Sequence, residues 1–288
     1  MSCSMKEDSG KIKIYSDFAS NYVKARTVRV WTPPDYDPSK KYAVLYMHDG
    51  QMLFDSTITW NKQEWAVDEE MSALHIDGKI KPTIVVGIDN ISEIRYTDYF
   101  PEKPFNSIPD SFLSEMDNMK YHGGASLLSY EIMSDEYLKF IVEELKPFID
   151  KNYSTQSDAE NTFIMGSSMG GLISMYAICE YPEVFGGAAC LSTHWPGIFR
   201  NENNPIPGLF IQYLKENLPD PDSHKIYFDY GTETLDSLYE VHQLKVDKVM
   251  KAGGYKPHNW MSIRFPGADH SENAWSDRLS VPLRFLLK

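Results

Sequence analysis

Short apolar segments alternate with helix-like segments along most of the chain, and this alternation restricts the fold more than any other feature. Several of the apolar runs are continuous, which is typical of strands that are buried on both faces of a sheet. Strands separated by helices predict a mostly parallel central sheet with helices on both faces, an α/β fold. The predicted strands are Thr27–Trp31, Ala43–Tyr46, Thr83–Ile88, Thr162–Met165, Ala188–Leu191, Ile226–Tyr230 and Met261–Phe265. The predicted helices are Glu64–Leu74, Asp135–Phe148, Met169–Glu180, Ser237–Ala252 and Ala274–Leu287, the second with Ser134 as its N-cap.

The chain has 288 residues and shows no internal repeat and no linker of biased composition. We therefore expect one domain over residues 1–288. Residues 95–130 fit the alternation poorly, because three prolines and two glycines interrupt any period. We expect this segment to be a loop-rich insertion that caps one end of the sheet.

Net charge limits the classes of partner, and the cysteine content indicates whether disulfides are expected. Lys and Arg number 28 and Asp and Glu 41, so the formal net charge is −13. Such a chain is repelled by nucleic acid and by anionic membranes, so neither is expected as a partner. Cys3, Cys179 and Cys190 do not suit a disulfide framework, and we expect free thiols. No apolar stretch is long enough to span a membrane, and the first residues lack the apolar core of a secretory signal. The sequence leaves the native compartment open, and it leaves the oligomeric state open as well.

The segment Gly166-Ser167-Ser168-Met169-Gly170 has the pattern G-x-S-x-G between a predicted strand and a predicted helix. In this context the central serine occupies a sharp turn, and small neighbours let the strand and helix approach each other. The pattern predicts Ser168 as an exposed nucleophile. The alternative is a glycine-rich turn with a capping serine.

A serine nucleophile needs a general base, and in this architecture a histidine follows the last strand. His270 lies in Pro266-Gly267-Ala268-Asp269-His270, directly after the strand Met261–Phe265. The carboxyl ends of parallel strands are where open α/β sheets place their sites. We therefore predict His270 as the base.

The carboxylate that orients the histidine should follow the strand Ile226–Tyr230. The turn after it offers Glu233 and Asp236, and Asp236 is preferred because it lies where the next helix begins. Glu233 remains the alternative, and Asp236 could instead cap that helix.

An ester carbonyl under attack becomes an oxyanion, which needs two donors. The amide after the nucleophile, Met169 N–H, is the first candidate. The second is Gln51 N–H, in the turn His48-Asp49-Gly50-Gln51 that ends an early strand. The alternative for that segment is an ordinary strand-ending turn.

Several motifs together resemble one branch of the α/β-hydrolases, the esterase branch that includes enterobactin-type siderophore esterases, feruloyl and acetyl-xylan esterases and S-formylglutathione hydrolase. These motifs are His48-Asp49-Gly50-Gln51, Leu145-Lys146-Pro147-Phe148-Ile149, Gly166-Ser167-Ser168-Met169-Gly170-Gly171, Leu191-Ser192-Thr193-His194-Trp195, and Gly267-Ala268-Asp269-His270 with Trp275. The resemblance spans residues 25 to 285 and implies an α/β-hydrolase fold and ester hydrolysis through Ser168 and His270.

Two further residues are candidates for substrate binding. Trp195 follows the strand Ala188–Leu191, and its indole could stack on an aromatic acyl group or a sugar, or pack in the core. Arg95 could bind a substrate carboxylate, although an ion pair with Asp98 or Glu102 is the preferred interpretation.

The sequence contains no nucleotide-binding or metal-binding motif, so no cofactor and no metal is expected. The leading hypothesis is a serine carboxylic-ester hydrolase with a Ser168, His270 and Asp236 triad, acting on small-molecule or polysaccharide-linked esters. Feruloyl or acetyl esters of plant cell-wall polysaccharides are the first substrate hypothesis. The alternatives are a siderophore trilactone esterase, an acyltransferase on the same scaffold, and a non-enzymatic binding module.

Overall fold

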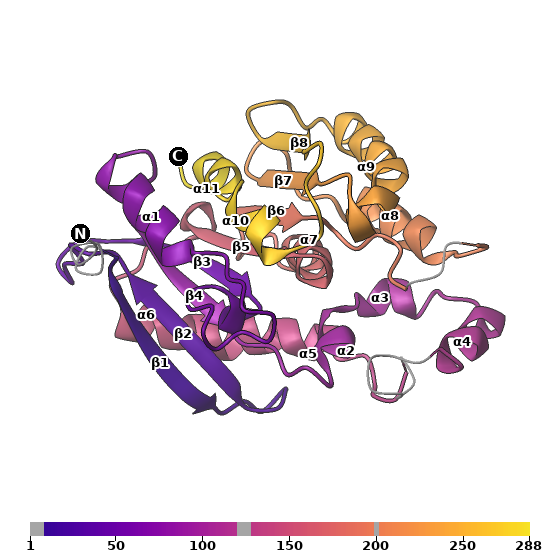
Figure 1. Cartoon of the computed structure of the whole chain (residues 1–288), viewed down its shortest axis with the longest axis horizontal. Coiled ribbons are helices and arrows are strands. Elements are labelled where there is room, and N and C mark those ends of the chain that lie inside the picture. Colours follow the sequence, from indigo (N-terminus) through magenta and orange to yellow (C-terminus); the bar gives the residue numbers. More distant parts are fainter. Residues whose placement is uncertain (1–8, 120–127, 199–201) are drawn as a thin grey trace.

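One twisted sheet of eight strands runs through the part of the chain that the computed structural model describes, residues 9–119, 128–198 and 202–288 (Figure 1). Its order is β1-β2-β4-β3-β5-β6-β7-β8. β1 and β2 pair antiparallel, as do β2 and β4, and all the other neighbours are parallel. The strands are β1 Lys11–Phe18, β2 Arg26–Thr32, β3 Ala43–His48, β4 Thr83–Ile88, β5 Thr162–Ser167, β6 Gly187–Leu191, β7 Lys225–Tyr230 and β8 Trp260–Arg264.

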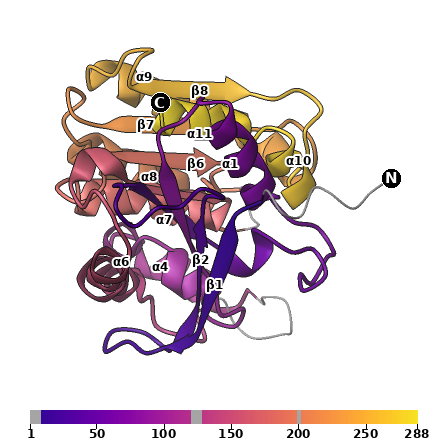
Figure 2. The same cartoon turned by 90° about the vertical axis from the view of Figure 1, so that its left-hand side faces the viewer.

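Helices cover both faces of the sheet, which explains the continuous apolar runs of the inner strands (Figures 1 and 2). In β3 all six residues are buried, with Val44 and Tyr46 on one face and Leu45 and Met47 on the other. The first face packs against α5 (Ser134–Lys139), α6 (Lys146–Asn152), α7 (Met169–Glu180), α8 (Ile206–Asn217) and α9 (Glu240–Ala252). The second packs against α1 (Val67–Ile76), α10 (Glu272–Ser276) and α11 (Ser280–Leu286). The predicted fold class is confirmed.

The seven predicted strands are all present, and the sequence reading missed β1 and α8. β1 is an edge strand, and most of its side chains are exposed, so it has no apolar run. The predicted helix at Ala274–Leu287 is two short helices, α10 and α11. The predicted helix at Ser237–Ala252 is preceded by a 3₁₀ turn at Thr234–Leu238.

The segment 95–130 is more regular than its prolines suggest. It contains α2 (Arg95–Tyr99), α3 (Glu102–Phe105) and α4 (Asp110–Asp117), each four to eight residues long. Pro101 and Pro109 occupy the N-cap positions of α3 and α4, where a missing N–H is tolerated. α2 packs against α5 and α7, and α3 packs against α8. Residues 120–127 of this insertion, which include Gly123 and Gly124, lie outside the described residues.

The predicted helix at Asp135–Phe148 runs from α5 through a π-helical segment, Phe140–Leu145, into α6. Pro147 has no N–H and its ring crowds the carbonyl of the preceding turn, which explains why the helix widens before it. Ser134 is not the N-cap as expected. It is the first helical residue, and its hydroxyl accepts a hydrogen bond from the Glu102 N–H at 2.9 Å.

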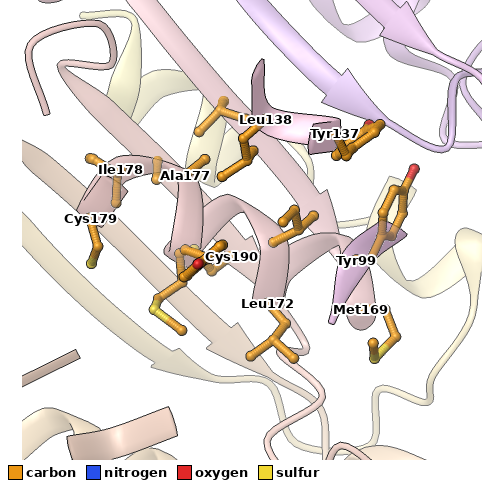
Figure 3. Close-up of a cluster of buried hydrophobic side chains, with 14 of the residues drawn as sticks. Tyr99, Tyr137, Leu138, Met169, Leu172, Ala177, Ile178, Cys179 and Cys190 are labelled. Atoms are coloured by element: carbon orange, nitrogen blue, oxygen red, sulfur yellow. The ribbon is translucent and has the colours of Figure 1, made fainter. Parts of the chain in front are cut away.

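Two of the cysteines lie in the main apolar cluster, which Figure 3 shows. Cys179 and Cys190 are buried free thiols, as expected, and burial raises the pKa of Cys179 above its usual range. Cys3 lies outside the described residues. The same cluster continues to Met169, beside Tyr99, so the core reaches the start of α7 (Figure 3).

Candidate active site

Ser168 is the single residue between β5 and α7, and its backbone has a conformation that serine rarely adopts. Its φ is 59° and its ψ −121°, and its backbone N–H donates to the Leu191 carbonyl at 2.9 Å. The side chain is half-buried, whereas Ser167 is only 4% exposed. Ser168 is therefore the serine that an ester could reach.

Three glycines make this turn sterically possible. A Cβ on Gly166 would lie 2.8 Å from the Gly170 carbonyl, and one on Gly171 would lie 2.9 Å from the Leu191 carbonyl oxygen. A Cβ on Gly170 would lie 3.3 Å from the Cβ of His48. The start of α7 thus packs directly against the end of β3, which brings two distant motifs together.

His270 and Asp236 lie next to each other at the carboxyl ends of the last two strands. His270 Nδ1 is 2.5 Å from Asp236 Oδ1, and the carboxylate accepts this hydrogen bond. Trp275 and Tyr239 contact the imidazole edge-on, with ring centroids at 5.0 and 5.8 Å. With Nδ1 occupied, the ring keeps Nε2 for proton transfer.

The carboxylate of Asp236 is buried and fixed by several donors. Its Oδ2 accepts from the Gly231 N–H at 2.6 Å and from the Ser192 hydroxyl at 2.5 Å. Glu233, the alternative acid, is exposed, and among the described residues its side chain forms a hydrogen bond with the neighbouring Thr232 hydroxyl and not with His270. The structure brings Asp236, and not Glu233, to His270.

Two backbone amides, one at the start of α7 and one in the turn after β3, are available for a ligand. Within the ranges that the structure covers, neither the Met169 N–H nor the Gln51 N–H donates to another group of the chain. Gln51 belongs to the 3₁₀ turn Gly50–Met52, and Asp49 precedes it with φ 58°. The Gln51 side chain accepts from the Asn90 N–H at 3.0 Å, which fixes this turn against the end of β4.

Tyr239 and His194 form a buried pair next to Ser168, and no sequence motif predicts this pair. The Tyr239 hydroxyl lies 2.8 Å from His194 Nδ1 and also contacts the Ser168 side chain. The His194 N–H donates to the Ser168 carbonyl at 3.1 Å. Burial, together with the nearby His270 and Arg95, lowers the pKa of His194 to about 3, so its ring is neutral at physiological pH. No local sequence signal marks Tyr239.

Arg95 forms an ion pair, but with neither of the expected partners. Its Nε and Nη2 bind the two oxygens of Asp49 at 2.8 Å each, and Asp98 pairs with Arg26 instead. Burial disfavours ionisation of Asp49, but Arg95 and Asn90 outweigh it and hold the pKa of this carboxyl below its usual value. Arg95 therefore connects α2 to the turn that carries Gln51.

Trp195 is a core residue in this structure. It is fully buried, its indole N–H donates to the Gln243 side chain at 3.0 Å, and its ring lies 5.9 Å from that of Phe228. Of the two roles that the sequence allowed, the structure shows packing in the core, and it exposes no face of the indole to a substrate.

Among the described residues, no group of three or more His, Cys, Asp or Glu side chains is arranged to hold a metal ion. No helix in the described ranges has the length and apolar character needed to cross a membrane.

The chain matches the model of a family described as "Putative esterase" over residues 20–286. It is 26% identical over 210 residues to the uncharacterized protein YbbA of Bacillus subtilis, covering 72% of this chain and 68% of that protein. It is 25% identical over 290 residues to an endo-1,4-beta-xylanase/feruloyl esterase of Xylanibacter ruminicola, covering 97% of this chain and 32% of that protein. It is 27% identical over 203 residues to the ferri-bacillibactin esterase BesA of B. subtilis, covering 65% of this chain and 58% of that protein.

Solved structures share the fold. An IroE-like serine hydrolase from Shewanella oneidensis superposes with a TM-score of 0.69 at 19% identity, covering 96% of this chain and 80% of that chain. A ferulic acid esterase from the anaerobic fungus Anaeromyces mucronatus superposes with a TM-score of 0.64 at 22% identity, covering 96% and 88%. At these identities the likeness extends to the fold and no further.

Proposed function

The chain belongs to the esterase family of carboxylic ester hydrolases, and we propose that it hydrolyses esters through a triad of Ser168, His270 and Asp236. The observation that carries this proposal is the contact of 2.5 Å between His270 Nδ1 and Asp236 Oδ1, at the sheet edge where Ser168 occupies its turn. A buried carboxylate in this position selects the tautomer of histidine that can accept a serine proton.

In the proposed reaction, His270 Nε2 takes the proton of the Ser168 hydroxyl as Oγ attacks the ester carbonyl. Met169 N–H and Gln51 N–H stabilise the oxyanion that forms. His270 then gives the proton to the departing alkoxide, which leaves as the alcohol. Water attacks the acyl-enzyme with His270 as base, and the acid and free Ser168 are released.

The test compares Ser168→Ala with Ser167→Ala. We expect Ser168→Ala to fold normally and to lose activity toward aryl esters by about 10⁴- to 10⁶-fold, because the covalent route is gone. Ser167→Ala removes a similar hydroxyl one residue away and should keep most of the activity. Equal losses in both variants, or labelling of Ser167 by an organophosphonate, would contradict the assignment.

We propose feruloyl or acetyl esters of plant cell-wall polysaccharides as the substrate class. The xylanase/feruloyl esterase relative, which matches over almost the whole of this chain, supports this proposal. The net charge of −13 disfavours an anionic ferric siderophore. Because one relative is named as a ferri-bacillibactin esterase, a catecholate trilactone belongs in the same assay panel as methyl ferulate and acetylated xylan.

Trp60 supports a carbohydrate on the alcohol side of the ester. Its side chain is 84% exposed, on a loop held by hydrogen bonds from Lys62 Nζ to the Thr57 carbonyl and from Asn61 to Glu272. Glu272 follows His270 by two residues, and His270 protonates the leaving alcohol in the proposed reaction. The loop thus borders the side on which the alcohol leaves, and an exposed indole suits the apolar face of a sugar ring.

We expect Trp60→Ala to raise KM about 3- to 10-fold for a feruloylated xylo-oligosaccharide, the range of one aromatic stacking contact. Methyl ferulate lacks the sugar, so its KM should stay the same. Ile76→Ala, at a residue that is 64% exposed on α1, is the control. Equal KM changes for both esters would refute the sugar-binding role of Trp60.

A further inference from the structure

A buried polar network surrounds the oxygen of Asp236 that His270 does not use. Ser192 Oγ lies 2.5 Å from Asp236 Oδ2, 3.0 Å from Trp275 Nε1 and 2.9 Å from Arg278 Nη2. The indole and guanidinium N–H groups can only donate, so they occupy the lone pairs of the hydroxyl. The single hydroxyl proton of Ser192 must therefore point to Asp236.

A second carboxylate holds the arginine of this network. Arg278 contacts Asp229 twice, Nε to Oδ2 at 3.2 Å and Nη2 to Oδ1 at 3.0 Å, and the Tyr227 hydroxyl donates to the same carboxylate. Arg278 Nη2 stays 4.0 Å from Asp236 Oδ2, beyond hydrogen-bond distance. All three charged side chains are at least 97% buried.

The charges in this cluster have a consequence for His270. Asp229 holds both Nε and Nη2 of Arg278, so the guanidinium stays near Asp236 without binding it, and the Asp236 carboxylate remains for His270. Without Asp229, the guanidinium would have Asp236 as its nearest carboxylate and would compete with His270 for it.

We propose that Ser192, Arg278 and Asp229 are positioning residues that hold the Asp236 carboxylate with Oδ1 turned to His270. This inference rests on the proposed function, since it concerns the acid of the same triad. Ser192 orients the carboxylate through Oδ2, Arg278 supplies a nearby positive charge, and Asp229 prevents that charge from capturing Asp236.

The backbone at Ser192 is consistent with a requirement for the hydroxyl. Its φ is 41°, a region in which glycine is comfortable and serine is strained. A glycine would relieve this strain but would remove the donor to Asp236. The two effects can therefore be separated by substitution.

The first experiment measures the pH dependence of kcat/KM for methyl ferulate in Ser192→Ala and Ser192→Gly. Without the hydroxyl, the charge of Asp236 is less compensated and holds the His270 proton more tightly. We expect the acidic limb of the profile to move up by about 0.5 to 1 pH unit, with kcat about 10-fold lower, in both variants. Ser72→Ala, at a buried serine of α1, is the control and should leave the profile unchanged.

The second experiment measures the same pH profile in Asp229→Asn, for which we expect the acidic limb to shift in the opposite direction. Here Arg278 is released toward Asp236, so the acidic limb should move to lower pH. Because this variant leaves a buried cation less compensated and could fail to fold, the double variant Asp229→Asn/Arg278→Gln replaces the ion pair by two amides. The acidic limb of its profile should move up, as in Ser192→Ala, because the guanidinium that lies 4.0 Å from Asp236 Oδ2 is gone.

An unshifted limb in Ser192→Ala and Ser192→Gly overturns the inference, as does a downward shift in the double variant. Loss of kcat in parallel with lowered unfolding stability and an unchanged profile would show a merely structural role. These results leave the proposed function intact. Hydrolysis that survives Ser168→Ala would instead refute the proposed function itself.

Discussion

The backbone of Ser168 is the most constrained point of the proposed site. A residue with a side chain at φ 59° and ψ −121° costs on the order of 1–3 kcal/mol, so the surroundings must hold it there. The Ser168 N–H donates to the Leu191 carbonyl, and the Ser168 carbonyl accepts from the N–H groups of Leu172 and His194. Strain at this residue is therefore maintained by the end of β6, the loop that follows it and the first turn of α7.

At the same scale, the acid of the proposed triad can be tested by comparing Asp236→Asn with Glu233→Gln. An amide at Asp236 can present its NH₂ to His270 and stabilise the wrong tautomer, so we expect kcat to fall by up to about 10⁴-fold. The Glu233 side chain is exposed and bonds to the Thr232 hydroxyl, not to His270, so Glu233→Gln should change kcat less than about twofold. Steady-state kinetics with an aryl acetate gives both values.

A severe loss confined to Glu233→Gln would mean that the exposed carboxylate, and not the buried one, orients the base. In that case the 2.5 Å contact between Asp236 and His270 would have only a structural role.

At the scale of elements, two loops share one carbonyl. Ala268 O accepts from the N–H groups of Thr232 and Glu233, which joins the turn before Asp236 to the turn before His270. Gly231 approaches this carbonyl so closely that a Cβ would lie 2.2 Å from its oxygen. The relative placement of acid and base thus depends on a glycine with no role in the chemistry.

We expect Gly231→Ala to separate these loops, lowering kcat at least 10-fold and destabilising the fold by about 1–3 kcal/mol, since the methyl group has no space. Gly208→Ala in α8 is the matched control, because a Cβ there meets nothing within 4 Å. Removing a flexible glycine from that helix should stabilise the protein by about 0.5–1 kcal/mol with unchanged kinetics. Urea unfolding and initial rates measure both effects. Similar kinetics for the two alanine variants would contradict the role given to Gly231.

At the scale of the whole molecule, buried histidines affect stability at low pH. Burial lowers the pKa of His48 to about 3, although Asp49 partly opposes this effect. Burial also lowers the pKa of His194 to about 3. Below pH of about 6.5 the unfolded chain binds protons at these residues and the folded chain does not. Each histidine therefore contributes stability above that pH, and the contribution is lost as the pH falls from about 6.5 toward 3.

Other groups act in the opposite direction. Burial and the neighbouring Glu69 raise the pKa of Asp68 to about 8, so that carboxyl favours folding more as the pH falls. The effect of one histidine is therefore best measured as a difference. The gap in unfolding free energy between the native sequence and His48→Gln should change by about 1.4 kcal/mol per pH unit between pH 6 and 4. A gap that does not vary with pH would show that His48 is not held neutral in the fold.

Local sequence was sufficient for the inner strands, for α7 and for the serine turn. Continuous apolar runs have few alternatives to burial between helices, and a G-x-S-x-G pattern between a strand and a helix leaves little conformational choice at Ser168. Local sequence did not predict β1, because most of its side chains are exposed and it therefore has no apolar pattern. It also failed for the short helices α2 and α3, which pack against α5, α7 and α8.

The α/β fold class and the turn at Ser168 could be predicted from short stretches of chain, because each depends on local patterns of apolar residues and glycines. The contact of Asp236 with His270, the burial of Trp195 and the pairing of Arg95 with Asp49 depend on the tertiary structure. These contacts join residues 34 to 48 positions apart in the chain, and for His270 and Arg95 the competing partners were all carboxylates. Spacing along the chain does not fix which of two carboxylates a side chain reaches, whereas the twist and order of the sheet do.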